Sequence, residues 1–170
     1  MKRLTLMRHA DARWKDVGLS DLERPLSRRG THAAQAMAQR LLSLKLLPDL
    51  VLVSPARRAQ QTAEILAREL SLPAARLLRD GGRYLAGAPE LLKSVRGTGP
   101  RISHLMLIAH NPGLSELVEL LSPEGADPTL GTAGVCSMTF ECAAWTQVDA
   151  ATLRQTQRES PPTGLFGRFS

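Results

Sequence analysis

The sequence predicts an α/β domain in three layers, with helices on both faces of a mostly parallel central sheet. Short apolar runs typical of buried strands lie at residues 4–7, 50–53 and 105–109. A segment with helical spacing of its apolar residues follows each run. Because strands that alternate with helices form parallel sheets covered on both faces, this order indicates an α/β/α sandwich.

The expected helix boundaries come from capping residues and prolines. Ser27, Ser54-Pro55 and Asn111-Pro112 each predict a helix start, because a capping side chain or a proline in the first turn favours one. The first helix is expected to run to about residue 47 and the second to end before Pro73. The remaining elements predicted are a helix at 89–95 and strands at 75–78, 135–141 and within 150–157.

Length and composition are those of a single globular domain. The 170 residues fit one domain over 1–160, followed by a loosely held tail at 161–170. The apolar runs are too short to cross a membrane, and the N-terminus lacks the hydrophobic segment of a secretory signal. We therefore expect a cytoplasmic protein without a membrane partner. Nothing in the sequence indicates an oligomeric state.

The charge pattern leaves nucleic-acid binding as the non-enzyme alternative. The net charge is +6, and only four of the 22 basic residues are lysines. Arginine on this scale suits nucleic acid or phosphate. Aromatic residues make up only 4% of the chain and do not alternate with basic ones, as a base-stacking surface would require. We expect no nucleic-acid partner.

Polar side chains follow three predicted strands at the point where each strand ends. The carboxyl ends of parallel strands meet at one edge of a sheet, where ligands bind, so we expect these side chains to converge. They are Arg8 and His9, Ser54 with Arg58 four residues on, and His110.

A metal site does not fit these residues. The chain has four histidines, and arginines near the candidate ligands would repel a cation. His32 and His104 are not at carboxyl strand ends, so we expect them at the surface or in capping positions. We expect no metal and no other cofactor.

An anion fits better than a cation. Guanidinium groups and helix N-termini both favour phosphate. A histidine beside an arginine can attack phosphorus directly, which gives a phosphohistidine intermediate that water later opens. The sequence therefore predicts phosphoryl-transfer chemistry that requires no metal.

Three segments resemble signatures of the histidine phosphatase superfamily, whose fold is also called phosphoglycerate-mutase-like. Arg8-His9-Ala10 resembles its Arg-His-Gly signature, with alanine in place of glycine. That change is tolerable unless the backbone needs a positive φ. The segment 54–63, Ser-Pro-Ala-Arg-Arg-Ala-Gln-Gln-Thr-Ala, resembles the second signature, and 107–112, which ends in His-Asn-Pro, resembles the third.

Within the superfamily the chain is most similar to the short SixA-type phosphohistidine phosphatases. Its size, the segment 24–30 and the absence of large insertions carry this likeness. The resemblance implies that His9 is the nucleophile and that Arg8 and Arg58 clamp the phosphate. It also implies that His110 is a further hydrogen-bond donor to the phosphate and that Arg24 is an additional contact of the anion.

The leaving group decides between possible substrates. Release of an alkoxide needs a placed acid, whereas imidazole leaves more easily. Asp80 is the candidate acid, although an Asp-Gly pair is equally typical of a turn. The resemblance implies phosphohistidine on a protein, such as a histidine phosphotransfer domain, as substrate. The alternatives are a phosphomonoesterase or mutase-like enzyme acting on a small phosphate ester, and a binding protein that keeps the pocket without turnover.

Overall fold

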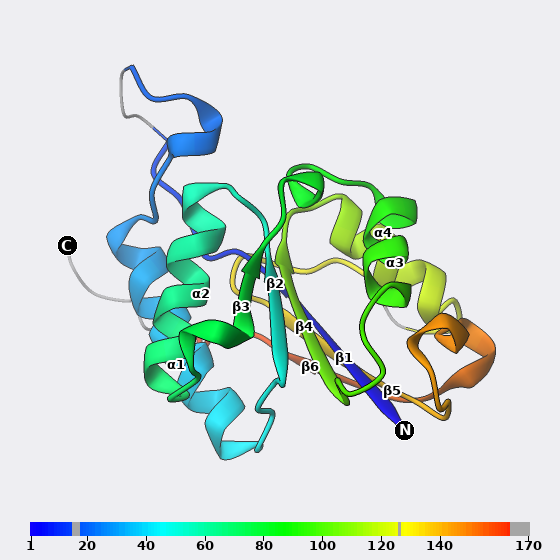
Figure 1. The fold of residues 1–170 in the computed structure, drawn as a ribbon. Coiled ribbons are helices and arrows are strands. Elements are labelled where there is room, and N and C mark those ends of the chain that lie inside the picture. The colour runs from blue at the N-terminus through cyan, green and yellow to red at the C-terminus, as the bar shows by residue number, and fades with distance from the viewer. Residues whose placement is uncertain (15–17, 126, 164–170) are drawn as a thin grey trace.

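A computed structural model describes residues 1–14, 18–125 and 127–163 of the chain (Figure 1). The described residues form one sheet with the strand order β3-β2-β4-β1-β5-β6. Its strands are β1 (Lys2–Arg8), β2 (Leu50–Val53), β3 (Leu77–Arg79), β4 (His104–Ala109), β5 (Val135–Phe140) and β6 (Leu153–Glu159). The α-helices are α1 (Arg28–Ser43), α2 (Arg57–Glu69), α3 (Ala88–Arg96) and α4 (Gly113–Leu121).

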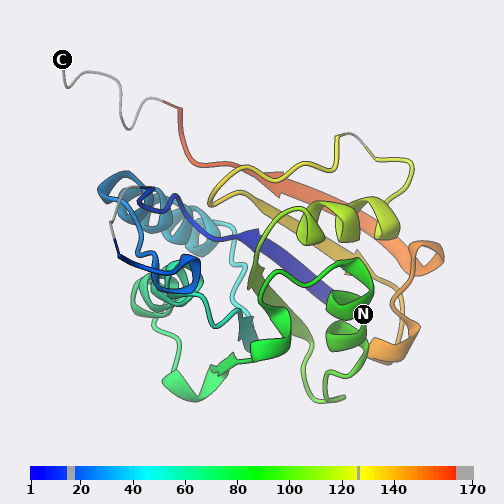
Figure 2. The ribbon, with the colours of Figure 1, turned by 90° about the horizontal axis from the view of Figure 1, so that it is seen from above.

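The sheet is mixed, so the prediction of a mostly parallel sheet was wrong in this respect. Strands β3, β2, β4 and β1 run parallel, whereas β5 is antiparallel to β1 and β6 is antiparallel to β5. Figure 2 shows these last two strands together at one side of the sheet. Only short 3-10 turns join β5 to β6, and antiparallel neighbours need no helical crossover.

Helices cover both faces of the sheet, α1 and α2 on one and α3 and α4 on the other (Figure 1). Alternate residues of β4 explain this arrangement. Met106 and Ile108 belong to the core beneath α1 and α2, while Leu105 and Leu107 belong to the core beneath α3 and α4. The central strand is therefore apolar at every one of these positions and is buried on both faces.

The first helix ends earlier than expected, at Ser43 rather than near residue 47. Lys45 adopts a left-handed backbone, with φ of 57°. Its N–H donates to the Leu42 carbonyl and the N–H of Leu46 donates to the Leu41 carbonyl, the bonding pattern that closes a helix in a Schellman motif. Glycine or asparagine usually takes this position, so a lysine there gives no sequence signal.

Two predicted helix caps have other roles. Helix α2 begins at Arg57, after Ala56, and the Ser54 hydroxyl hydrogen-bonds His110 while also accepting weakly from the Ala56 N–H at 3.3 Å. Helix α4 begins after Pro112. The side chain of Asn111 donates to the Leu130 carbonyl instead of capping that helix.

His104 is buried, so the expectation of a surface or capping position was wrong. Its Nδ1 lies 3.1 Å from the Leu47 carbonyl and its Nε2 lies 2.8 Å from the Thr5 hydroxyl. Because a carbonyl only accepts, Nδ1 donates and Nε2 accepts from Thr5. The histidine begins a central strand, and the chain that precedes β2 covers it.

No helix among residues 1–14, 18–125 and 127–163 is long and apolar enough to cross a membrane. Of the predicted tail at 161–170, only the first three residues belong to the described part, and 164–170 lie outside it.

Candidate active site

The strand register brings the polar strand ends together. Arg8 of β1 pairs with Ala109 of β4, so His9 and His110 follow at adjacent positions. Their ring centroids are 5.1 Å apart. On the other side of β4, the Ser54 N–H donates to the Ile108 carbonyl at 3.0 Å, which places the end of β2 beside His110. The predicted convergence is therefore present at the carboxyl edge of the sheet.

A pocket of about 180 Å³ lies at this edge. Five of the six predicted site residues line it, and the other lining residues are Asp11, Ala12, Trp14, Leu85, Asn111 and Thr132. The five are Arg8, His9, Arg24, Arg58 and His110. Asp80 is not among the lining residues, and its Oδ1 accepts from the Gly82 N–H in the turn that precedes α3. Among the described lining residues, the one with a carboxyl side chain is Asp11.

His9 presents a neutral ring nitrogen to the pocket. Only 8% of the residue is exposed, and Nδ1 donates to its neighbour's carbonyl, that of Ala10, at 2.8 Å. With its proton on Nδ1, the ring keeps a lone pair on Nε2, which no described residue hydrogen-bonds. Burial is the main cause that lowers the pKa of His9 to about 4. The hydrogen bond to Ala10 acts in the opposite direction, and the charges of Arg58 and Arg8 act in the same direction as burial. The ring is therefore neutral at pH 7.

The backbone around His9 is fixed from two sides. The Ala10 N–H donates to Thr62 Oγ1 of α2 at 3.0 Å, and that hydroxyl donates to the Arg58 carbonyl. Ala10 does not adopt a positive φ, so alanine is tolerated where the family signature has glycine. Gly30 allows α1 to approach, because a Cβ there would lie 2.0 Å from the Asp11 carbonyl oxygen.

His110 is also neutral but has partners at both ring nitrogens. Its Nε2 lies 2.6 Å from the Ser54 hydroxyl, and its Nδ1 lies 3.4 Å from a terminal nitrogen of Arg58. Because a guanidinium only donates, Nδ1 accepts and Nε2 carries the proton. Burial lowers the pKa of His110 to about 3, with further contributions from His9 and Arg58.

Two guanidinium nitrogens in the site are buried without a partner among the described residues. They are the Nε atoms of Arg8 and Arg58. Arg58 is only 3% exposed, and Arg8 reaches the Leu130 carbonyl through its Nη1 alone. A buried hydrogen-bond donor without an acceptor is unfavourable in free energy, so these N–H groups indicate an anion-binding site.

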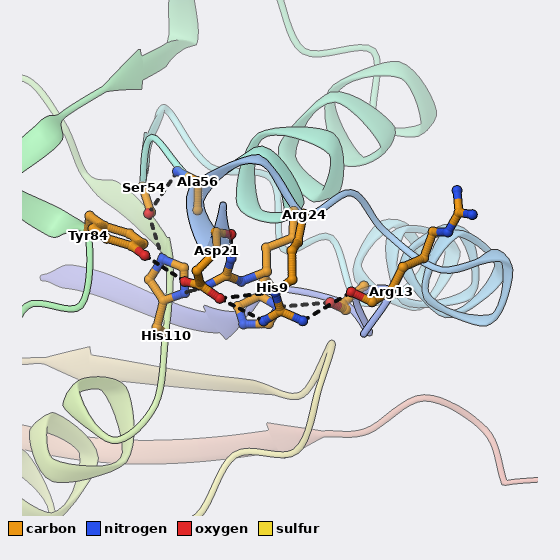
Figure 3. Close-up of polar contacts among 10 residues, drawn as sticks. His9, Arg13, Asp21, Arg24, Ser54, Ala56, Tyr84 and His110 are labelled. Atoms are coloured by element: carbon orange, nitrogen blue, oxygen red, sulfur yellow. Dashed lines mark hydrogen bonds and ion pairs between the residues drawn. The ribbon is translucent and has the colours of Figure 1, made fainter. Parts of the chain in front are cut away.

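Sequence reasoning missed Asp21 and Tyr84, which meet above the histidines (Figure 3). The Tyr84 hydroxyl donates to Asp21 Oδ2 at 2.6 Å, and the Tyr84 ring stands edge-on to His110 with centroids 5.7 Å apart. Asp21 also pairs with Arg24, three residues along the chain. That i, i+3 spacing was the one available signal, and it gives no indication of Tyr84.

The donor set does not suit a metal ion. Within residues 1–14, 18–125 and 127–163, no group of three or more His, Cys, Asp or Glu side chains is placed to hold one. Arginine side chains surround the two histidines instead. The chemistry that this arrangement favours is that of an oxyanion facing an imidazole nucleophile.

Comparison with known proteins agrees with this geometry. Residues 4–79 match the family model of the histidine phosphatase superfamily (branch 1). Phosphohistidine phosphatase SixA of Escherichia coli K12 is 32% identical over 141 residues, which cover 80% of this chain and 84% of that protein. An uncharacterized chloroplastic protein of Arabidopsis thaliana is 31% identical over 158 residues, 88% of this chain and 71% of its own.

Solved structures give the same result. The protein histidine phosphatase SixA, solved in complex with tungstate, superposes with a TM-score of 0.77 at 27% identity, over 94% of this chain and 97% of that one. The chain therefore belongs to the histidine phosphatase superfamily. Within that superfamily its relatives place it in the SixA branch.

Proposed function

We propose that this protein is a phosphatase that removes the phosphoryl group from phosphohistidine on a protein, with His9 as the nucleophile. The observation that carries the proposal is the neutral His9 ring, whose Nε2 faces a pocket lined by two guanidinium groups with unpartnered Nε–H donors. Nucleophile and phosphate clamps are thus side by side, the requirement for direct attack on phosphorus.

The proposed reaction has two steps. In the first, His9 Nε2 attacks phosphorus and the bond from phosphorus to the substrate's imidazole nitrogen breaks, with its electron pair going to that nitrogen. In the second, water attacks phosphorus, the bond to Nε2 breaks, and inorganic phosphate leaves. Arg8 and Arg58 stabilise the charge on the phosphoryl oxygens in both steps. Bound phosphate favours protonation of His110 Nδ1, which then donates to an oxygen instead of accepting from Arg58.

Pocket size supports a substrate carried on a protein. Small-molecule sites usually enclose roughly 300–1,000 Å³, whereas this pocket has about 180 Å³. That volume suits a phosphoryl group and the end of a side chain. The exposed residues Trp14 and Leu85, 81% and 59% exposed, line the pocket and are available to a protein surface around the phosphorylated side chain.

The acids near the pocket support a phosphorus–nitrogen bond as the bond broken. The hydrogen bond from Tyr84 and the contacts with Arg24 and Arg58 lower the pKa of Asp21 to about 2, so this carboxylate has no proton to give an alkoxide. Asp11 accepts from the Ser27 hydroxyl at 2.7 Å. Imidazole leaves without the strong acid that an alkyl ester requires.

A cytoplasmic location for this activity stays a prediction.

The test compares substrates on one enzyme preparation. We expect kcat/KM for a phosphorylated histidine phosphotransfer domain to exceed that for alkyl phosphate esters by a factor of about 100 or more. The reason is that imidazole leaves without a general acid, whereas an alkoxide needs one. Asp11→Asn should leave phosphohistidine hydrolysis within about threefold, since no acid is needed there. Equal or faster hydrolysis of the esters, abolished by Asp11→Asn, would contradict the proposal and favour a phosphomonoesterase.

A further inference from the structure

Asp21 contacts three side chains from three segments of the chain (Figure 3). Its backbone carbonyl accepts from Arg58 Nη1 at 2.7 Å and its Oδ2 accepts from Arg58 Nη2 at 3.1 Å. Oδ2 also accepts from the Tyr84 hydroxyl, and Oδ1 accepts from Arg24 Nε at 3.0 Å. One residue of the loop between β1 and α1 thus connects both arginines with the segment that follows β3.

The contacts with Arg58 determine which part of its guanidinium faces the pocket. Both terminal nitrogens of the Arg58 guanidinium donate hydrogen bonds to Asp21. The Nε of Arg58 remains buried and without a partner among the described residues. Arginine can bind a phosphoryl group through the side of its fork, which Nε and one terminal nitrogen form. Asp21 therefore occupies the edge of Arg58 that the anion does not need.

The charge of Asp21 has a second consequence. Arg8, Arg24 and Arg58 line one small pocket and repel one another. A carboxylate between two of them offsets this repulsion and fixes two flexible side chains before an anion binds. Arginine held in place loses less conformational entropy on binding phosphate than a free one would.

The Tyr84 contact extends this arrangement across the pocket mouth. Tyr84 follows a 3-10 turn after β3 and lies edge-on to His110. The next residue, Leu85, has a φ of 52°, which is rare for leucine, and lines the pocket. A non-glycine residue in this region indicates a backbone that its surroundings hold in place. The Asp21–Tyr84 hydrogen bond joins this segment to the loop after β1.

We infer that Asp21 is a positioning residue of the phosphate site: it orients Arg58 and Arg24 toward the phosphoryl group and fastens the Tyr84 segment at the pocket mouth. The inference rests on the proposed function, because it assumes that the pocket binds a phosphoryl group. The opposite hypothesis is that the Asp21 carboxylate competes with the anion for the same guanidinium groups. The two hypotheses predict opposite signs for the effect of removing its charge.

Tungstate, a tetrahedral oxyanion, is the probe, and its dissociation constant is measured by isothermal titration calorimetry. Asp21→Asn should weaken tungstate binding by about tenfold or more, because charge-assisted bonds that preset both arginines are lost. Glu23→Gln is the matched control, since it removes one carboxylate from the same turn, where the Glu23 side chain accepts hydrogen bonds from Ser20 within the described part of the chain. Its dissociation constant should stay within about twofold, as for a surface charge.

A double-mutant cycle separates positioning from a general effect on the fold. Tyr84→Phe should weaken tungstate binding a few-fold on its own, in line with about one lost hydrogen bond, and should add nothing in the Asp21→Asn background. Melting temperatures of all variants should lie within a few degrees of the wild type, because Asp21 is half-exposed. Additive effects in the cycle would contradict a role of Asp21 in holding Tyr84.

The outcomes for the inference and for the proposed function differ. If wild-type protein binds no tungstate, the proposed function fails and the inference fails with it. If wild-type protein binds tungstate while Asp21→Asn binds it equally well or more tightly, only the inference is overturned. Weaker binding by Asp21→Asn with an unchanged Glu23→Gln control supports it.

Discussion

Each of the two edges of the sheet holds a buried histidine, and the difference between the two shows what distinguishes the proposed nucleophile from a structural imidazole. His9 at the carboxyl edge and His104 at the amino edge are both 8% exposed. Burial lowers the pKa of each to about 4. By exposure and pKa alone the two residues are equivalent.

Their hydrogen bonds separate them. Both ring nitrogens of His104 have partners, the Leu47 carbonyl and the Thr5 hydroxyl. Among the described residues, His9 forms a hydrogen bond through Nδ1 only, and its Nε2 faces a pocket that Arg8 and Arg58 line. A buried histidine with both nitrogens satisfied is part of the packing, whereas one with a free nitrogen beside guanidinium groups is placed for chemistry.

The largest effect expected from this difference is on catalysis. His9→Ala should lower kcat for phosphohistidine hydrolysis by a factor of at least about 10³, because His9 supplies the nucleophile in the proposed reaction. His104→Gln should lower the melting temperature but leave kcat within about threefold at a temperature where the variant is folded. Steady-state kinetics with circular dichroism as the folding control measures both. Comparable losses of kcat in the two variants would remove the distinction.

Next in size is the effect of the arginines that face the free nitrogen. Arg58→Ala should raise KM and lower kcat/KM by a factor of about 10², the order expected for a buried donor to a transferring phosphoryl group. Arg57→Ala is the control: Arg57 is the preceding residue in the same helical turn and is exposed. Its kcat/KM should stay within about twofold. An equal loss in both variants would point to net charge rather than to a clamp at Arg58.

A smaller effect, which differs between the two edges, is the change in histidine pKa when an anion binds. Nuclear magnetic resonance should place the pKa of both His9 and His104 near 4, as burial predicts. Tungstate should raise the pKa of His9 and His110 and leave that of His104 unchanged, because an anion favours the protonated form only at the edge where it binds. In the proposed reaction the neutral ring is the nucleophile, so kcat/KM should fall as pH drops through about 4. An acid limb near pH 6.5 would show that His9 is not desolvated.

The smallest effect lies at the amino edge and spares catalysis. Thr5→Val leaves His104 Nε2 and the Ser137 hydroxyl without their partner. The free energy of unfolding should fall by about 1–3 kcal/mol, the cost of buried polar groups left unsatisfied. Thr156→Val, in the exposed part of β6, is the control and should change the free energy of unfolding by less than about 0.5 kcal/mol. Urea titration measures both, and kcat should be unchanged in each variant.

Local pattern was enough to predict the strands that carry the site. Apolar runs marked β1, β2 and β4, and the rule that parallel strand ends share an edge brought His9, Arg58 and His110 together. Strands were also expected at 135–141 and within 150–157, where β5 and β6 lie, but their antiparallel direction was not, because a short strand has the same pattern in either direction and its partner decides. The early end of α1 escaped because Lys45 carries no signal for a left-handed backbone.

The missed site residues depend on contacts between segments far apart in the chain. Asp21 and Tyr84 are 63 residues apart and meet only once β1 and β3 lie in one sheet. His104 was misjudged for the same reason, since Thr5, whose hydroxyl forms a hydrogen bond with its Nε2, is 99 residues away. Asp80 is the converse case: its sequence suited a catalytic acid and a turn equally, and its carboxylate caps the turn.

The most direct measurement is to trap the phosphoryl group on the enzyme. Protein mixed with a phosphohistidine donor is quenched in alkali within the first turnover, and the phosphorylated peptide is identified by mass spectrometry. We expect an acid-labile phosphoryl group on His9 in wild-type protein and in His104→Gln, and none in His9→Ala. A phosphoryl group on another residue, or turnover without any phosphorylated enzyme, would contradict the assignment of His9 as the nucleophile.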